Sequence, residues 1–252
     1  MLLKQLEESR LPAIALRFDA RELDGLPAPV QRYLRAVLQD AQPIVTGVTV
    51  QHSGTFNMSA NGERWMRFTS RQRVATRRPG FVWNACIRVV PGVQVVVHDA
   101  YVAGVGKLNA SLLGLFTLAK LEGPGEIARG ELVRYLAEAA WYPTALLPSQ
   151  GVCWTAIDDR SAQAILTDGA VSLTAQFVFD AAGLIEAVRV EARGAVVRAA
   201  IVMTPWEGRM SNYQQRNGML VPLTCEAAWL PRGGRKPYWR GTIMSIAHEF
   251  AG

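Results

Sequence analysis

The chain has 252 residues, of which half are apolar and 19% are charged, so it can bury a large core and does not belong to the disordered class. Its formal net charge of +6 permits acidic partners without requiring them. The cysteines Cys86, Cys153 and Cys225 are too widely spaced for a disulfide framework or a zinc site, and no apolar run near the N-terminus has the length of a membrane span. We therefore expect a cytoplasmic protein with no signal peptide, no membrane span, and neither a metal nor another cofactor.

Residues 1–42 are predicted to form a helical segment that packs on the rest of the protein. The part from Leu26 to Asp40 has the clearest pattern, because its apolar residues recur at helical spacing and Pro29 suits a first helical turn. The apolar positions are Val30, Tyr33, Leu34, Val37 and Leu38. One face of this helix must therefore dock on another element.

Residues 43–252 are predicted to form a single antiparallel β domain. Segments rich in β-branched and aromatic residues alternate with turn signals such as Asp168-Gly169, and one expected strand runs from Val196 to Met210. The intervals between turns are too short for crossover helices. We expect a mainly β (α+β) fold, in which a large curved antiparallel sheet or partial barrel carries the N-terminal helices and one central helix.

The central helix is predicted at about residues 125–142. Its residues Glu131, Arg134 and Glu138 are spaced so that the arginine lies between two carboxylates on one helix face. We favour an ordinary ion-pair ladder on the surface, because charged residues are seldom fully buried. The alternative is a buried cluster that holds the helix over a pocket, in which Glu131 and Arg134 bind the ligand.

An aromatic corner follows this helix at Trp141, Tyr142 and Pro143. Proline ends the helical pattern, and the two rings before it carry a large apolar area with polar edges. The corner suits either a plug in the core or the wall of a ligand pocket.

The hairpin around Pro91-Gly92 is the best candidate for chemistry. If its strands are symmetric about that dipeptide, Asn84 opposes Asp99, and both share one face with Arg88, Tyr101 and several valines. A carboxylate in apolar surroundings must be paired or have a raised pKa. Two interpretations remain: Asp99 is a general base or acid, with Tyr101 assisting and Arg88 and Asn84 binding the ligand, or Asp99 forms a structural pair. A register shift of one residue would move Asp99 to the opposite face.

The segment Thr204–Arg209 predicts a fixed bend, because it combines proline, tryptophan and glycine. Glu207 within it is either a charge in a turn or a carboxylate in a pocket. Trp206 and Tyr213 are candidate ligand-binding residues at the mouth of the same pocket.

An arginine row occupies alternate positions of one predicted strand, at Arg67, Arg71, Arg73 and Arg77, with Trp65 in the same row. Such a row can bind phosphate, nucleic acid or an anionic surface. A solvated outer face explains it as well, and we favour that interpretation because no nucleic-acid motif accompanies the row.

Several motifs together resemble a bacterial family known only as a domain of unknown function. They include LPAPVQRYL, GFVWNACIR, AWYPTALLP and TPWEG, and the resemblance runs over most of the chain from Leu26 onward. Many members have an acidic residue where this chain has Asn84, which argues against a mechanism with two carboxylates at that place. The resemblance implies no established activity. The curved sheet is also similar in architecture to the half-barrels of periplasmic lipoprotein carriers.

The leading hypothesis is that a curved β-sheet binds a lipophilic or aromatic small molecule in an apolar cavity. The alternative is a cofactor-independent lyase, isomerase or hydrolase, in which Asp99 or Glu207 moves a proton in that cavity. Whether the protein is an enzyme, and its oligomeric state, stay open at this stage.

Overall fold

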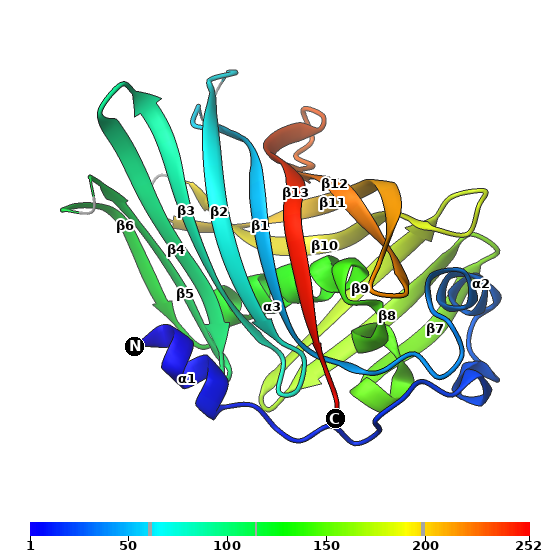
Figure 1. Ribbon diagram of the computed structural model, residues 1–252. Coiled ribbons are helices and arrows are strands. Elements are labelled where there is room, and N and C mark those ends of the chain that lie inside the picture. The colour runs from blue at the N-terminus through cyan, green and yellow to red at the C-terminus, as the bar shows by residue number, and fades with distance from the viewer. Residues whose placement is uncertain (60–61, 114, 198–199) are drawn as a thin grey trace.

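The computed structural model describes residues 1–59, 62–113, 115–197 and 200–252 (Figure 1). The strand expected from Val196 to Met210 includes residues 198–199, which lie outside these ranges. The α-helices are α1 (Leu2–Glu8), α2 (Ala28–Val37) and α3 (Glu126–Glu138). Short 3-10 helices span Ala20–Leu23, Ala139–Trp141, Pro143–Leu146 and Pro148–Gln150.

The strands before α3 are β1 (Val45–Asn57), β2 (Trp65–Ala75), β3 (Gly80–Val90), β4 (Val93–Val102), β5 (Val105–Leu112) and β6 (Phe116–Gly123). The strands after it are β7 (Val152–Asp158), β8 (Ser161–Asp168), β9 (Val171–Phe179), β10 (Ile185–Val197), β11 (Ala200–Arg216), β12 (Met219–Trp229) and β13 (Lys236–Phe250).

The described residues form one antiparallel sheet of thirteen strands, in the order β6-β5-β4-β3-β2-β1-β13-β12-β11-β10-β9-β8-β7. The sheet curves strongly, and α3 lies in its concave side between β3–β6 and β7–β10 (Figure 1). The prediction of a mainly β protein with a large curved sheet and one central helix is confirmed.

Alternation of apolar and polar residues explains why the strands take these faces. In β9, for example, every second side chain is buried and those between are at least partly exposed. The buried ones are Val171, Leu173, Ala175, Phe177 and Phe179. Burying each larger apolar side chain contributes about 1.5–3 kcal/mol, so a one-residue slip of the strand would be costly.

The N-terminal helices pack on the sheet through the faces that their sequence indicates. In α2, Pro29 lies in the first turn, and Val30, Tyr33 and Leu34 are fully buried where the helix contacts β8 and β12. In α1, Leu6 is buried against the ends of β2, β3 and β4. The division into residues 1–42 and 43–252 stays a prediction. None of the helices in the described ranges combines the length and apolarity that a membrane crossing requires.

The position of α3 depends on a close approach to β5 at Gly106. A Cβ atom there would lie 2.7 Å from the backbone of Ile127 and Ala128, far inside van der Waals contact. Glycine therefore lets the first turn of α3 rest directly on the sheet, and this contact fixes the helix in the concavity.

Candidate functional site

The register of β3 and β4 differs from the symmetric hairpin that the sequence predicts. Asp99 pairs with Trp83, because a β-bulge between Arg88 and Val90 adds one residue to β3. Asp99 therefore shares the concave face with Trp83, whereas Asn84 and Arg88 lie on the opposite face. The predicted grouping of Asp99 with Asn84 and Arg88 is wrong.

Asn84 and Arg88 contact other groups on the face of the sheet opposite Asp99. The Asn84 Oδ1 atom lies 2.5 Å from Nδ1 of His98, its cross-strand neighbour. The Arg88 side chain is exposed to solvent opposite Gln94. Neither residue can reach a ligand in the concave side.

Arg134 of α3 is the centre of a buried polar cluster. Its Nη1 donates to Oδ2 of Asp99 at 3.0 Å, and its Nε donates to Oε1 of Glu138 at 2.7 Å. Its Nη2 donates to the Gln72 side-chain oxygen at 3.2 Å. The favoured prediction of a surface ladder is wrong, because this face of α3 packs on β3 and β4 instead of facing water, and the alternative of a buried cluster describes the structure.

Aromatic rings hold the Arg134 guanidinium group from the side of the sheet. Its carbon lies 4.8 Å from the centre of the Phe81 ring and 4.7 Å from that of Trp83. Cation–π contacts of this kind replace part of the hydration that a buried cation loses. The charge of Arg134 is thus fixed in place by two carboxylates and two rings.

A second arginine, Arg193 of β10, reaches α3 from the other half of the sheet. Its Nε donates to the Gly130 carbonyl at 3.0 Å, and its Nη1 donates to the Tyr238 hydroxyl at 3.1 Å. Trp206 donates its indole N–H to the same hydroxyl at 3.0 Å, and the Arg193 guanidinium lies 5.2 Å from the Trp206 ring. Trp206 is therefore a neighbour of the cluster, and its role as a ligand-binding residue stays a prediction.

The sequence patterns do not single out Arg193 and Tyr238. A signal was present in the glycine that follows Arg193, because glycine inside a strand often marks a bulge or a close approach. The structure has a bulge between Val190 and Arg193. Because of this bulge, the Arg193 side chain lies on the same face of the sheet as Trp206.

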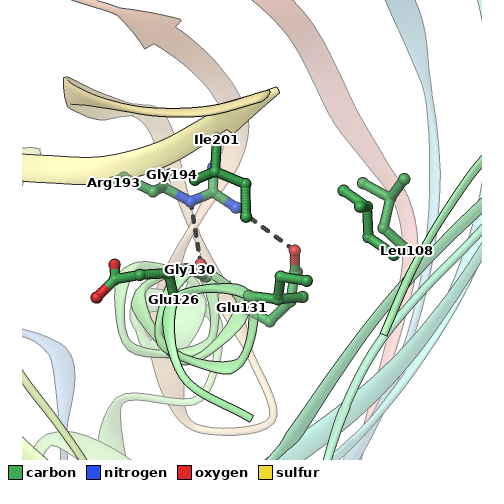
Figure 2. A pocket seen from close by; sticks show the side chains of 9 residues that line it. Leu108, Glu126, Gly130, Glu131, Arg193, Gly194 and Ile201 are labelled. Atoms are coloured by element: carbon green, nitrogen blue, oxygen red, sulfur yellow. Dashed lines mark hydrogen bonds and ion pairs between the residues drawn. The ribbon is translucent and has the colours of Figure 1, made fainter. Parts of the chain in front are cut away.

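Glu131 has the fewest hydrogen bonds of the charged residues in the cluster. Its side chain projects from α3 and lies between Arg193 and Leu108 (Figure 2). Its Oε1 lies 3.8 Å from Nη2 of Arg193, which is too long for a hydrogen bond. Its Oε2 is buried and accepts no hydrogen bond from any described residue, and the same holds for Oδ1 of Asp99. Two buried carboxyl groups therefore each keep an oxygen without a donor.

A cavity of about 50 Å³ opens beside this carboxylate. Its lining residues are Leu108, Leu121, Glu126, Ile127, Gly130, Glu131, Arg193, Gly194 and Ile201. The cavity is large enough for a few water-sized groups, so its wall offers an acceptor to whatever enters.

The two carboxyl groups hold protons more tightly than exposed ones do. Burial, with the neighbouring charge of Asp99, raises the pKa of Glu131 to about 7. Burial also raises the pKa of Asp99, although the charges of Arg134 and Arg193 oppose this. Two guanidinium groups face three carboxyl groups here, so one proton retained near neutral pH would balance the charges of the cluster.

Cross-strand pairing extends the site into an apolar surface. Asp99 pairs with Leu108 and Leu108 with Leu121, while Leu112 pairs with Phe116. We give the name β5–β6 strip to five concave-facing apolar residues of these two strands at the sheet edge: Leu108, Ala110, Leu112, Phe116 and Leu121. The strip is only partly covered, and Phe116 is 64% exposed.

Tyr101 lies on the same face as Asp99 but is engaged elsewhere. Its hydroxyl donates to Oδ2 of Asp168 at 2.8 Å, and Arg78 donates to the other oxygen of that carboxylate at 2.6 Å. Burial and the Asp168 contact raise the pKa of Tyr101. Tyr101 is therefore a buried structural group, and its predicted assistance to Asp99 is not supported by this geometry.

The aromatic corner is a plug in the core. Trp141 is 2% exposed and packs 4.9 Å from the ring of His52. The Tyr142 hydroxyl donates to the carbonyl of Tyr135 at 2.8 Å. Thr144, just beyond, accepts from the backbone N–H of β1 at 3.0 Å, so the corner fastens α3 to the sheet and does not line the cavity.

Glu207 and Tyr213 do not join the site. Glu207 follows Trp206 in β11 and so faces the other side of the sheet, where it accepts from Arg189, Arg209 and Arg235 at 2.7–2.8 Å. Burial alone would raise the pKa of Glu207, but these hydrogen bonds, led by that from Arg235, lower it. The interpretation of Glu207 as a pocket carboxylate is wrong.

Tyr213 is also engaged away from the cavity. Its hydroxyl donates to the Ile185 carbonyl at 2.8 Å.

The arginine row is divided between two roles. Arg67 and Arg71 are exposed on β2, as the favoured interpretation of a solvated face expects. Arg73 instead pairs with Glu7 of α1 and with Glu249 of β13. In the described part of the chain, no group of three or more His, Cys, Asp or Glu side chains is arranged to hold a metal ion.

Fold and site together define a curved antiparallel half-barrel that holds one helix and a buried cluster of charges in its concave side. The chain belongs to the family of unknown function DUF6920, which matches residues 24–248. The resemblance that the sequence motifs carry is thereby confirmed.

Two solved structures are similar to this chain at low sequence identity. The LolA superfamily protein NE2245 from Nitrosomonas europaea is 8% identical, with a TM-score of 0.40 over 89% of this chain and 94% of that one. The beta-barrel-like protein of the domain of unknown function DUF1849 from Brucella abortus is 9% identical, with a TM-score of 0.28 over 82% of this chain and 99% of that one. No curated protein matches this chain.

Proposed function

We propose that the protein binds a lipophilic small molecule along the β5–β6 strip, with one polar end of the ligand in the cavity beside Glu131. The observation that carries the proposal is the continuity of these two surfaces, because Leu108 and Leu121 belong to both. An apolar surface that ends in a few polar groups is the usual form of a site for an amphipathic ligand.

The partial exposure of the strip supports this proposal. Phe116 is 64% exposed although it faces the concave side, and neighbouring Leu115 and Leu118 are 78% and 56% exposed. Apolar side chains that gather on one edge of a monomer are typical of binding sites. The edge strand β6 therefore supplies the entrance in this proposal.

The space in the concave side is smaller than the large apolar cavity expected from the sequence. Helix α3 and the aromatic corner occupy much of the concave side, and the cavity of about 50 Å³ takes no more than the end of a ligand. The proposed binding mode is thus a chain lying on a strip, with its end inserted. A cytoplasmic location, expected from the sequence, stays a prediction.

Titration with N-phenyl-1-naphthylamine tests the proposal, because the fluorescence of this neutral lipophile rises in apolar surroundings. Leu112→Glu sets a charge in the middle of the strip and should weaken binding about tenfold or more. Ile157→Glu is the matched control, since Ile157 is 49% exposed on β7 at the other edge of the sheet. Equal affinities of these two variants, with unchanged circular dichroism, would refute the strip as the site.

Acid–base catalysis is the second candidate, and the raised pKa values of Asp99 and Glu131 favour it. A carboxyl group that titrates near pH 7 suits proton transfer at physiological pH. In a screen of lyase, isomerase and hydrolase substrates, Asp99→Asn should lower turnover by about 10²-fold or more. A rate that this substitution leaves unchanged ends the assignment of Asp99 as general base.

A further inference from the structure

The polar end of the ligand can be specified from the free acceptor that Glu131 offers to the cavity. Resting on the proposed function, we propose that the site selects lipophiles that end in a primary ammonium group, which donates to Glu131. The class of ligand is thus a long-chain amine or a lipid with an aminoalkyl head.

The unsatisfied oxygens are the geometric basis of this inference. Glu131 is 6% exposed and lines the cavity, and its Oε2 has no donor among the described residues. Asp99 Oδ1 is likewise buried without one, but Asp99 does not line the cavity. A buried acceptor without a donor keeps its full desolvation cost, so a ligand that donates to Glu131 recovers that cost.

The charge balance distinguishes an ammonium group from a neutral donor. The guanidinium groups of Arg134 and Arg193 face the carboxyl groups of Asp99, Glu131 and Glu138, which leaves one excess negative charge when all are ionised. A ligand cation neutralises that excess, whereas a hydroxyl group does not. A carboxylate or phosphate head would add a second uncompensated anion and is disfavoured.

The size of the cavity and the number of donors favour a primary amine. About 50 Å³ holds a terminal ammonium and the methylene groups next to it. A primary ammonium has three N–H donors, and charge-assisted hydrogen bonds to carboxylates are about twice as strong as neutral ones. A trimethylammonium head has the same charge but no N–H to donate.

Binding of an ammonium should also displace the proton from Glu131. The pKa of this group is about 7 because of burial and the Asp99 charge, so a cation beside it favours the ionised form. Calorimetric titration near pH 6.5, in buffers with different ionisation enthalpies, should therefore detect net proton release with decylamine and none with decanol.

Four probes with the same decyl chain test the inference on the intact protein: decylamine, decyltrimethylammonium, decanol and decanoate. Decylamine should bind at least about tenfold more tightly than each of the others at pH 7.5. Glu131→Gln should reduce this preference to about threefold or less. Glu122→Gln, which alters a carboxylate that pairs with Lys107 on the opposite face of β6, should keep the preference.

The possible outcomes separate this inference from the proposed function. If all four probes bind alike, the ammonium preference is refuted and the strip remains. If decyltrimethylammonium binds as tightly as decylamine, the site recognises positive charge alone, and recognition of the N–H donors is refuted. If no probe binds, both proposals fail. A preference that survives in Glu131→Gln, or an absence of proton release in the native protein, refutes the role of Glu131.

Discussion

Two carboxylates that are almost equally buried, Glu207 on the outer face of the sheet and Glu131 on the concave face, have opposite properties. Glu207 is 2% exposed and accepts from three arginines, and its pKa is lowered. Glu131 is 6% exposed, its one arginine is 3.8 Å away, and its pKa is raised to about 7. Glu207 lies beneath half-exposed arginines that donate to it, whereas Glu131 lies deep in the concave side with no donor from the described residues within hydrogen-bond distance. Depth and the count of donors together separate a structural charge from a group that is free to bind.

The largest expected effect comes from removing the guanidinium group that the inner cluster shares. Arg134→Met leaves Asp99 and Glu138 buried without their partner, and breaking a buried pair in this way costs about 3–5 kcal/mol. Urea unfolding measures the loss. Arg209→Met is the outer counterpart: Arg209 is 50% exposed, and Glu207 keeps two arginines, so its cost should stay below about 1 kcal/mol. Equal costs would mean that the two clusters do not differ as described.

A smaller effect is expected from Glu131→Gln, and it depends on pH. The folded pKa of about 7 lies above the ordinary value of 4.5, so the native state binds the proton more tightly than the unfolded chain. The contribution of Glu131 to stability is therefore complete below about pH 4.5 and is lost as pH rises through 7. The variant should equal the native protein at pH 4 and exceed it by about 1–3 kcal/mol at pH 8. Thermal unfolding at both pH values gives the difference, and the reverse order would contradict the raised pKa.

Glu207→Gln should give the opposite pH dependence with a smaller amplitude. The folded pKa of Glu207 lies below 4.5, so its contribution is present above that pH and is lost as pH falls through the folded value. We expect a cost of about 1 kcal/mol or less at pH 7, because Arg189 and Arg209 are about half exposed and water screens their charges. The cost should shrink in unfolding measurements as the pH is lowered from 7 toward 3.

The smallest effects are expected on the convex side of β3. Asn84→Ala and Arg88→Gln should each change stability by less than about 0.5 kcal/mol, as surface substitutions usually do. Both should leave N-phenyl-1-naphthylamine binding unchanged, because neither side chain reaches the concave face. A loss of binding in either variant would restore the register that the symmetric hairpin predicts.

The fold was predictable because it follows from patterns that repeat along the chain. Alternation in segments such as β9, and the helical spacing of Val30, Tyr33 and Leu34 in α2, recur often enough that local errors do not alter the architecture. The site depends instead on single-residue details. The bulge between Arg88 and Val90 reverses which residues accompany Asp99, and nothing in the hairpin sequence specifies it.

The burial of the Arg134 cluster also could not be deduced from α3 alone. The spacing of Glu131, Arg134 and Glu138 is the same in a surface ladder and in a buried network. Whether these three side chains are buried depends on β4 and β10, which supply Asp99 and Arg193 from distant parts of the sequence. Sequence spacing identified the residues, and the tertiary contacts decided their environment.

The pairing of β1 with β13 has a consequence for the order of folding. All other neighbouring strands are consecutive in the chain, so β1–β6 and β7–β13 can form as two meanders from local hairpins. The pair Val45 and Phe250 closes the longest loop, and such contacts form late because their entropic cost is high. Pulsed hydrogen exchange during refolding should show late protection of β1 and β13, and early protection would contradict this order. Since α3 connects the two meanders and lies between them, the step that joins them is also the step that removes water from Arg134 and Glu131.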